Sequence, residues 1–253
     1  MTTALITGAS SGLGAEYARQ LAKRGSDLVL VARDETALEA LARQLRTDHR
    51  VQVEVLPADL VEAGGIARVE SRLGSREQPV DMLVNNAGFG LPLAFEQNDI
   101  EDEVRHLRLH NEVAMRLMHV ALQGMLERGS GRIINVASVA AFIPRSTYSA
   151  VKQWLVLFSR WANGRYKPRG VTVTAVCPGY THTSFHERLG LPPGQEGIPR
   201  VMWLHAPAVI AESLRDAERG RSVSIPSLRY KLIVALTRVL PQNFLASVGE
   251  RGR

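Results

Sequence analysis

Short apolar runs alternate with longer amphipathic segments along most of this 253-residue chain, and no other feature restricts its fold as strongly. Each run carries Val, Ile or Leu on successive residues, a pattern typical of parallel strands that are buried on both faces. The seven predicted strands are Ala4–Thr7, Asp27–Ala32, Val51–Leu56, Met82–Val84, Arg132–Ala137, Val171–Cys177 and Ser222–Ile225.

The segments between these runs have helical periodicity. The predicted helices are Gly12–Arg24, Glu35–Thr47, Glu62–Leu73, Asp99–Glu127 and Tyr148–Lys167. Strict alternation of strand and helix implies right-handed crossovers and a doubly wound sheet. No linker, repeat or low-complexity stretch divides the chain. We therefore expect one α/β domain over residues 1–253, with a mostly parallel sheet of about seven strands.

The charge and cysteine content exclude several classes of protein. The net charge is +6, but six basic residues and one acidic residue lie between positions 221 and 253, which leaves only +1 for the rest. A nearly neutral body without a recognition motif argues against nucleic-acid binding. The only cysteine, Cys177, excludes a disulfide framework and a cysteine-based zinc finger. Its position at the end of a strand predicts a small core residue.

The N-terminus has none of the features of a targeting segment. The first strand leads into a glycine-rich turn with no basic region before it, so no signal peptide is predicted. No apolar run approaches the roughly 20 residues that span a bilayer. We therefore expect a cytoplasmic protein.

The glycine-rich turn Thr7–Gly14 follows the first strand and opens the first helix. Its Gly-x3-Gly-x-Gly spacing is a variant of the dinucleotide fingerprint, in which glycine lets the backbone approach a pyrophosphate at a helix N-terminus. The predicted contacts are Gly8, Ser10, Ser11, Gly12, Leu13 and Gly14. The alternative is an ordinary tight turn. A hydrolase nucleophile elbow at Ser10 is disfavoured, because too few residues precede it to build an oxyanion hole.

The residue after the second strand selects between dinucleotides. An acidic residue there hydrogen-bonds the ribose of NAD, whereas an Arg accommodates the 2′-phosphate of NADP. Arg33 comes first and can grip a phosphate with two N–H groups. Asp34 follows it and can equally cap the helix that begins at Glu35. The sequence favours NADP(H) and leaves NAD(H) as the alternative.

A tyrosine and a lysine lie four residues apart at the start of the last predicted helix. This spacing places Tyr148 and Lys152 on one helical face. A nearby ammonium stabilises a phenolate and lowers the tyrosine pKa, which makes the tyrosine a usable acid or base. The alternative is an incidental pair on a solvated face.

Short motifs occur in order at the ends of the predicted strands. They are the Thr7–Gly14 turn, Asp59, Asn85-Asn86-Ala87-Gly88, Ser138, Tyr148-x3-Lys152 and Pro178–Thr183. With this set, the sequence resembles the short-chain dehydrogenase/reductase family over nearly its whole length. The resemblance implies a Rossmann-like fold and an NADP(H)-dependent oxidoreductase that interconverts a carbonyl and an alcohol.

The resemblance also assigns roles to individual residues. Tyr148 looks like the general acid/base, and Ser138 like the donor that holds the substrate carbonyl. Lys152 would lower the pKa of the tyrosine and bind the nicotinamide ribose, while Asn111 would continue a proton relay through water. The other implied cofactor contacts are Asp59, Leu60, Asn86, Ala87, Gly88, Tyr148, Pro178, Gly179 and Thr183.

One spacing departs from the family pattern. Ser138 and Tyr148 are ten positions apart, fewer than the family leads us to expect, so the loop Val139–Thr147 is short. Ser146 or Thr147 is therefore an alternative donor to the carbonyl. Ser138 is favoured because it ends a strand, as the resemblance requires.

Two histidine pairs are spaced for one helical face. His182 and His186 have neither a third ligand at a convincing spacing nor a zinc motif, so no metal site is predicted. His106 and His110 are expected on a helix surface or at an oligomer interface.

The last part of the chain is expected to shape the substrate site. In the family that the sequence resembles, a loop at about residues 180–205 covers the substrate. The segment at about 226–253 is apolar with interspersed basic residues. It is predicted to contain a helix packed on the substrate cleft or on a neighbouring subunit. The alternative is a basic amphipathic segment that meets an anionic membrane surface or an anionic acyl carrier.

The expected partner is a small carbonyl or alcohol substrate, either a lipophilic ketone or an acyl compound, bound by a homodimer or homotetramer. The alternative function is a non-catalytic NADP(H)-binding sensor or scaffold. The presence of all four residues Asn111, Ser138, Tyr148 and Lys152 argues against it.

Overall fold

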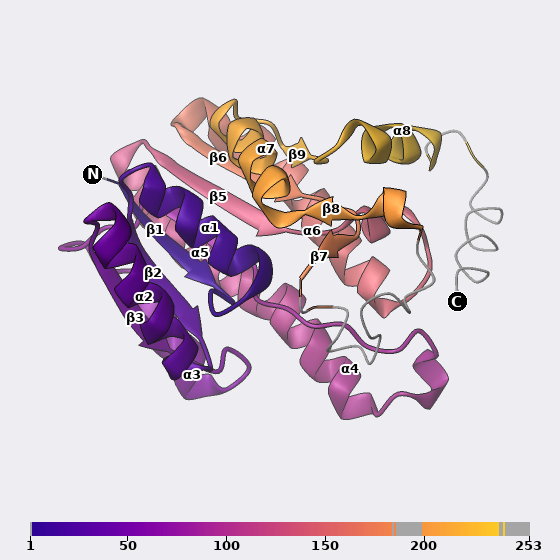
Figure 1. Ribbon diagram of the computed structural model, residues 1–253, viewed down its shortest axis with the longest axis horizontal. Helices are drawn as coiled ribbons and strands as arrows, with labels where there is room; N and C mark the ends of the chain where they lie inside the picture. The colour runs from indigo at the N-terminus through magenta and orange to yellow at the C-terminus, as the bar shows by residue number, and fades with distance from the viewer. Residues whose placement is uncertain (1, 184, 186–198, 238–239, 241–253) are drawn as a thin grey trace.

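A computed structural model describes residues 2–183, 185, 199–237 and 240 of the chain as a seven-stranded parallel sheet between two layers of helices (Figure 1). The strand order is β3-β2-β1-β4-β5-β6-β9. The strands are β1 (Thr3–Thr7), β2 (Asp27–Ala32), β3 (Val53–Pro57), β4 (Met82–Asn85), β5 (Gly131–Val136), β6 (Val171–Val176) and β9 (Val223–Ser224). The predicted fold class is confirmed.

Helices cover both faces of the sheet, and each face combines helices from different parts of the chain. One face carries α1 (Gly12–Lys23), α2 (Glu35–His49) and α7 (Ala206–Glu218). The other carries α3 (Ala63–Leu73), α5 (Ala114–Arg128) and α6 (Thr147–Tyr166). Two further helices, α4 (Ile100–Leu107) and α8 (Leu228–Thr237), lie toward one end of the sheet (Figure 1).

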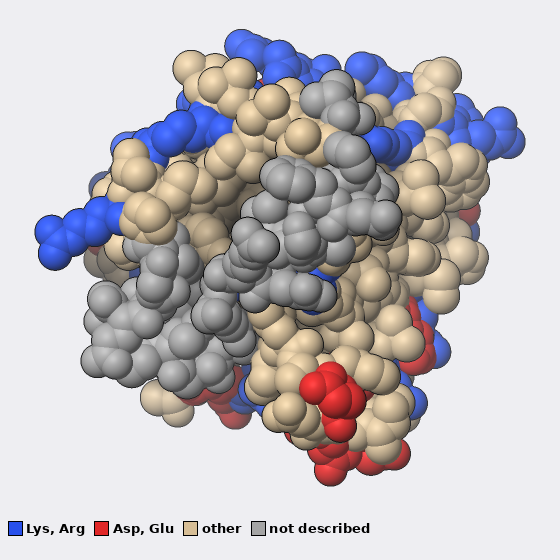
Figure 2. Space-filling model, turned by 90° about the vertical axis from the view of Figure 1, so that its right-hand side faces the viewer, with Lys and Arg blue, Asp and Glu red and all other residues tan. Residues whose placement is uncertain are grey.

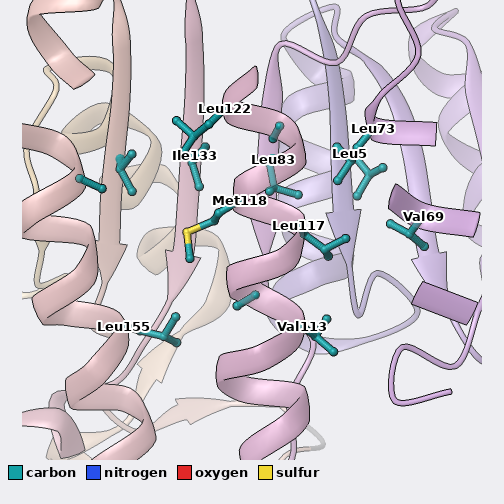
Figure 3. Close-up of a cluster of buried hydrophobic side chains, with 14 of the residues drawn as sticks. Leu5, Val69, Leu73, Leu83, Val113, Leu117, Met118, Leu122, Ile133 and Leu155 are labelled. Carbon is teal, nitrogen blue, oxygen red and sulfur yellow. The ribbon is translucent and has the colours of Figure 1, made fainter. Parts of the chain in front are cut away.

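Successive strand residues supply the two hydrophobic cores, because their side chains point to opposite faces of the sheet. In β1, Leu5 belongs to the core under α3, α5 and α6, whereas Ala4 and Ile6 belong to the core under α1, α2 and α7. Figure 3 shows Leu5 in the first core with Leu117 and other side chains of α5. Burial on both faces explains why the strands appear in the sequence as continuous apolar runs.

The chain reverses its winding direction at the centre of the sheet. β1 pairs with β2 on one side and with β4 on the other, and the two halves of the sheet grow outward from this pair. In open α/β sheets, ligands bind at the carboxyl ends of the strands beside such a reversal. The topology therefore places a binding crevice where β1, β4 and β5 end.

The long helix predicted at Asp99–Glu127 is not uniform. It consists of α4, a π-helical turn at Arg108–Val113, and α5. Such single π turns often occur at functional sites. This one contains His110 and Asn111.

Among the described residues, one α-helix and two short strands were not predicted. Helix α7 has Pro207 in its first turn and buries Val209, Ile210, Leu214 and Ala217, a helical spacing that the sequence contains. The short strands β7 (Thr181–His182) and β8 (Leu204–His205) pair with each other inside the expected substrate loop. Two-residue strands carry too little pattern to be predicted. Other predicted boundaries differ by at most two residues.

Within the described residues, no helix combines the length and the apolar character needed to cross a membrane.

Candidate active site

A cleft of about 1200 Å³ runs along the carboxyl ends of the strands. It is lined by every residue predicted to contact cofactor or substrate except Gly14 and Asn111. One end is formed by Arg33 and Asp59, and the middle contains Tyr148. At the other end, α8 contributes residues such as Val234. The cleft is therefore long enough to hold an extended dinucleotide and a second molecule.

The glycine-rich turn is packed so tightly that side chains larger than glycine do not fit at its key positions. Gly8 has a φ of +66°, and a Cβ added to Gly14 would lie 2.2 Å from the carbonyl oxygen of Gly8. Gly14 thus serves close packing between α1 and the turn rather than lining the cleft. The first turn of α1 has no acidic residue. Its positive N-terminal end therefore faces the cleft uncompensated, as a pyrophosphate requires.

Asn86 holds this turn against the end of β4. Its side-chain amide donates to the carbonyl oxygens of Thr7 and Gly8, at 2.9 and 3.1 Å. The hydroxyl of Thr7 accepts from the backbone N–H groups of Asn86 and Ala87, both at 3.0 Å. These bonds give Asn86 a structural reason for its place in the motif, alongside its position on the cleft wall.

The nucleotide-selecting end carries two arginines around one carboxylate. Asp59 lies 3.9 Å from the guanidinium of Arg33 and accepts a hydrogen bond from Arg105 at 3.2 Å. The side chain of Arg33 is 72% exposed, so it can turn toward a bound phosphate. Asp34 accepts from the N–H of Ala37 at 2.9 Å and caps α2. Its carboxylate is therefore engaged in capping, and the first residue after β2 presents a positive charge.

Ser138, Tyr148 and Lys152 meet at the middle of the cleft. Tyr148 has a side-chain hydrogen bond with Ser138, and the Lys152 ammonium lies 5.4 Å from the centre of the Tyr148 ring. Lys152 donates to the carbonyl oxygen of Val136 at 2.7 Å. Ser146, the alternative carbonyl donor, caps α6 by accepting from Ser149 at 3.4 Å. The geometry thus brings Ser138 to the tyrosine and directs Ser146 to the helix end.

Burial shifts the pKa values of both central groups. It raises the pKa of Tyr148 to about 12, although the hydrogen bond with Ser138 opposes the rise. It lowers the pKa of Lys152 to about 7. The sequence predicts a lowered tyrosine pKa, and in this protein structure desolvation outweighs that effect. Tyr148 is therefore protonated at neutral pH, the form that can donate a proton.

Asn111 lies beside this group without lining the cleft. From the π-helical turn, its side-chain amide donates to the carbonyl oxygen of Val151, one residue before Lys152, at 3.2 Å. Its side-chain oxygen is buried and has no hydrogen-bond partner among the described residues. Asn111 thus fastens α6 to the π turn, close to the lysine that it was predicted to serve.

The prediction that His106 and His110 lie on a helix surface or at an interface is wrong. Both are buried, at 1% and 2% exposure. Their ring centres are 4.5 Å apart, and lie 6.0 and 5.8 Å from that of Tyr148. The π turn and the inward-facing side of α4 carry them into the site, which spacing alone could not reveal.

Acid destabilisation is expected from this pair. Burial lowers the pKa of His106 from 6.5 to about 4 and lowers that of His110 as well. Between pH 6.5 and about pH 4 the unfolded chain binds more protons than the folded one. The contribution of His106 to the free energy of unfolding is therefore fully present above pH 6.5 and is lost as the pH falls toward 4. For His106 the loss should be on the order of 1–3 kcal/mol.

Urea unfolding of the wild type and of His106→Gln, at neutral pH and near pH 4.5, measures this loss. The variant should lose less stability on acidification than the wild type. His119→Gln, on the exposed side of α5, is the matched control and should behave as the wild type does. Equal losses of stability in all three proteins would contradict the assignment of the acid destabilisation to His106.

The far end of the cleft is apolar. Its lining side chains there are Phe89, Leu91, Leu93, Ile143, Phe185, Tyr230, Ile233 and Val234. Tyr230 is held in place by donating to Met202 at 2.8 Å and accepting from Tyr180 at 3.1 Å. A Cβ on Gly179 would lie 2.0 Å from its ring, so glycine is needed at that position. Sequence reasoning missed Tyr230, because no motif marks it.

Helix α8 covers this end of the cleft. Tyr230, Val234 and Thr237 are buried, whereas Leu228, Leu232 and Leu236 are exposed on the opposite side. Figure 2 shows one face of the molecule, with Lys and Arg side chains gathered along its upper edge and Asp and Glu side chains at its lower edge. Residues 238–239 and 241–253 of the segment lie outside the described residues.

Among the described residues, no group of three or more His, Cys, Asp or Glu side chains is placed to hold a metal ion. His182 stacks on Trp203, with ring centres 4.7 Å apart. His186, its suggested partner, lies outside the described residues. Cys177 is buried, as predicted.

Comparison with known proteins identifies relatives of this chain. The family model for short chain dehydrogenases matches residues 2–192. A very-long-chain 3-oxoacyl-CoA reductase from Anas platyrhynchos is 32% identical over 188 residues, which cover 71% of this chain and 60% of that protein. Inactive hydroxysteroid dehydrogenase-like protein 1 from Homo sapiens is 33% identical over 187 residues, covering 72% of this chain and 56% of that protein.

Among solved structures, a short-chain dehydrogenase from Sphingobium yanoikuyae in complex with NADPH is similar over almost its full length. The TM-score is 0.86 at 35% sequence identity, and the match covers 94% of each chain.

Proposed function

The chain belongs to the short-chain dehydrogenase family, and we propose that it is an NADP(H)-dependent oxidoreductase that interconverts a carbonyl and an alcohol. The observation that carries the proposal is the meeting of Ser138, Tyr148 and Lys152 in the middle of a cleft that also holds a glycine-rich turn. A family member with an acid, a donor and an ammonium at this point has what carbonyl chemistry requires.

The residues along the cleft fit NADP(H). The uncompensated N-terminus of α1 suits the pyrophosphate, and the exposed guanidinium of Arg33 suits the 2′-phosphate. Lys152, with further N–H donors beyond the one given to Val136, would hold the nicotinamide ribose. The similar structure from Sphingobium yanoikuyae contains NADPH, which supports the same choice.

The proposed chemistry assigns one task to each central residue. NADPH, when bound, supplies the hydride. Tyr148, which is protonated at neutral pH, donates its hydroxyl proton to the carbonyl oxygen. Ser138 donates a hydrogen bond to the same oxygen and stabilises the charge that develops there. Lys152 holds a positive charge beside the tyrosine, which stabilises the phenolate left after proton transfer.

The apolar end of the cleft favours a lipophilic substrate. Aromatic and aliphatic side chains from four separated segments, including Phe89, Ile143, Phe185 and Ile233, face the space beyond Tyr148. Burying apolar substrate surface there contributes about 25 cal/mol per Å². The similarity to a very-long-chain 3-oxoacyl-CoA reductase points to the same class. A ketone or 3-oxoacyl compound with a long apolar portion is the proposed substrate.

The alternative function is a non-catalytic NADP(H)-binding sensor or scaffold. It is favoured by the similarity to a human protein described as an inactive hydroxysteroid dehydrogenase-like protein. The presence of all three central residues in hydrogen-bonding or electrostatic contact argues for catalysis instead. The homo-oligomer, and the membrane or acyl-carrier contact of the C-terminal segment, stay predictions.

A substrate screen tests the proposal. Purified protein is mixed with NADPH or NADH and with ketones and 3-oxoacyl thioesters of increasing apolar length, and nicotinamide absorbance is followed. We expect oxidation of NADPH that becomes more efficient with apolar length. Tight NADPH binding without turnover on any carbonyl would favour the sensor or scaffold.

Arg33 is expected to determine the preference for NADPH. Arg33→Gln removes the guanidinium, and a charge-assisted hydrogen bond of about 1.5–3 kcal/mol corresponds to a KM increase of roughly 10–100-fold for NADPH. Because Arg33 is largely exposed, the lower part of that range is expected. The KM for NADH should change little. Steady-state kinetics with both cofactors measures this, and Arg76→Gln is the control, because Arg76 pairs with Glu127 and neither residue lines the cleft. An unchanged ratio of the two KM values in Arg33→Gln would contradict the role.

A further inference from the structure

A small cavity lies behind the central lysine, next to the large cleft. Its volume is about 10 Å³, room for a single water molecule. The polar residues that line it are Thr7, Asn85, His110 and Lys152. All four are buried. A polar site of this size in a protein interior is where an ordered water is expected.

The hydrogen bonds of His110 assign its tautomer. Its Nε2 lies 2.8 Å from the carbonyl oxygen of Phe89, so Nε2 carries the proton and donates it. The contact of the Phe89 N–H with the same nitrogen is longer, at 3.3 Å. Nδ1 is then an acceptor. It is buried and has no hydrogen-bond partner among the described residues.

Asn85 presents a second acceptor to the same cavity. Its side-chain amide donates to the oxygen of Asn135 at 2.9 Å, which directs its own Oδ1 elsewhere. The amide of Asn135 in turn donates to Ser159 at 2.9 Å, so the orientation of both amides is consistent. Oδ1 of Asn85 is buried without a partner among the described residues. An unsatisfied buried acceptor costs about 1–3 kcal/mol.

Lys152 is the donor that faces these two acceptors. One of its N–H groups is given to the carbonyl oxygen of Val136. The ammonium has two further N–H donors, but neither Nδ1 of His110 nor Oδ1 of Asn85 has a hydrogen-bond partner among the described residues, so Lys152 does not bond to either acceptor directly. A water molecule would complete the set, because it accepts one hydrogen bond and donates two.

We propose that one water molecule in this cavity accepts from the Lys152 ammonium and donates to Nδ1 of His110 and Oδ1 of Asn85, which makes His110 a positioning residue for Lys152. The proposal rests on the proposed function, since it gives Lys152 its task. It differs from the relay predicted through Asn111, whose side chain bonds to Val151 and does not line this cavity.

The surroundings hold His110 firmly in the required position. A Cβ on Gly88 would lie 2.4 Å from its Cε1, so the backbone of the Asn85–Gly88 motif packs directly on the imidazole. The rings of His106, Phe89 and Tyr148 contact the other sides, at 4.5, 6.2 and 5.8 Å between centres. An imidazole packed in this way is suited to holding a water in one place.

Lys152 is the group near this site that titrates around neutrality. Burial lowers its pKa to about 7. The pKa values of Tyr148 on the same helix and of Cys177 at the end of β6 are both raised to about 12. His106, which also faces Glu103, and His110 have lowered pKa values. A water that accepts from the ammonium stabilises the charged lysine, so its loss lowers the pKa of Lys152 further.

Two substitutions of His110 distinguish the roles of its two ring nitrogens. His110→Asn retains an acceptor at the Nδ1 position, whereas His110→Gln retains a donor toward Phe89 and loses that acceptor. Because activity needs the charged lysine, the high-pH limb of kcat/KM should move to lower pH by at least about half a unit in His110→Gln. His110→Asn and the exposed control His119→Gln should keep the wild-type limb. An unshifted limb in His110→Gln, or an equal shift in His110→Asn, would overturn the proposal.

A second measurement does not depend on the variants or on turnover. A crystal structure of the wild-type protein should contain a water within about 2.7–3.2 Å of Lys152 Nζ, His110 Nδ1 and Asn85 Oδ1. A dry cavity, or a water that misses His110, would overturn the proposal even if the enzyme reduces ketones. Absence of any carbonyl reduction by the wild type, with the water in place, would instead refute the proposed function.

Discussion

Replacing Tyr148 with Phe is expected to reduce kcat for carbonyl reduction by about 10²–10⁴-fold, the usual contribution of a general acid. The substitution removes one hydroxyl from a half-buried ring and keeps its contacts with His106, His110 and Phe185. Binding of NADPH, followed by fluorescence, should therefore change little. Stopped-flow measurement of a single turnover separates the loss in chemistry from any change in product release.

Tyr166→Phe is the matched control, since it makes the same change at the far end of α6, away from the cleft. It should keep the wild-type kcat. If Tyr148→Phe turned over as fast as this control while still binding NADPH, Tyr148 would not be the acid. A complete loss of NADPH binding in Tyr148→Phe would mean that the hydroxyl serves the cofactor instead.

Gly14→Ala is expected to damage both stability and cofactor binding. The added Cβ would lie 2.2 Å from the Gly8 carbonyl oxygen and 2.6 Å from the Asn86 amide. Neither can move without displacing the turn that faces the pyrophosphate. Such overpacking costs about 1–3 kcal/mol or more, a fall in Tm of roughly 2–10 °C for a chain of this size. We expect the Kd for NADPH to rise about tenfold or more, because a misplacement of this order costs that much in a preorganised site.

Gly164→Ala provides a control with the opposite expected sign. Gly164 lies on the exposed side of α6, and nothing lies within 4 Å of an added Cβ. Alanine there should stabilise the helix by up to about 1 kcal/mol and leave the Kd for NADPH unchanged. Calorimetry and isothermal titration on both variants give the comparison. A Gly14→Ala protein with the stability and affinity of Gly164→Ala would refute the close packing of the first turn.

Local sequence patterns predicted much of the cleft, because many of its functional groups lie within a few residues of one another in the chain. Tyr148 and Lys152 share a helix, so a spacing of four residues is enough to place them on one face. The turn from Thr7 to Gly14 is contiguous, and its glycines mark it directly. Arg33 follows a strand whose apolar run is unambiguous. In each case the chemistry depends on residues a few positions apart.

The errors arose where position depends on distant packing. His106 and His110 carry no signal that distinguishes an exposed helical face from a buried one, and a π turn changes which way they point. Burial, which raises the pKa of Tyr148 instead of lowering it, depends on helices and loops from the whole chain. Tyr230 reaches Met202 and Tyr180 across 28 and 50 positions. No local pattern encodes such contacts.

The sequence by itself determined the α/β class and the family, and it indicated a dinucleotide site at the first turn, with NADP(H) favoured over NAD(H). These follow from hydrophobic periodicity and contiguous motifs, which are properties of the chain. Only the tertiary structure decided that two histidines are buried beside Tyr148, that α8 covers an apolar end of the cleft, and that Lys152 faces a water-sized cavity with His110 and Asn85. Each of these brings together side chains from separate elements, and desolvation and hydrogen-bond satisfaction are set by that assembly.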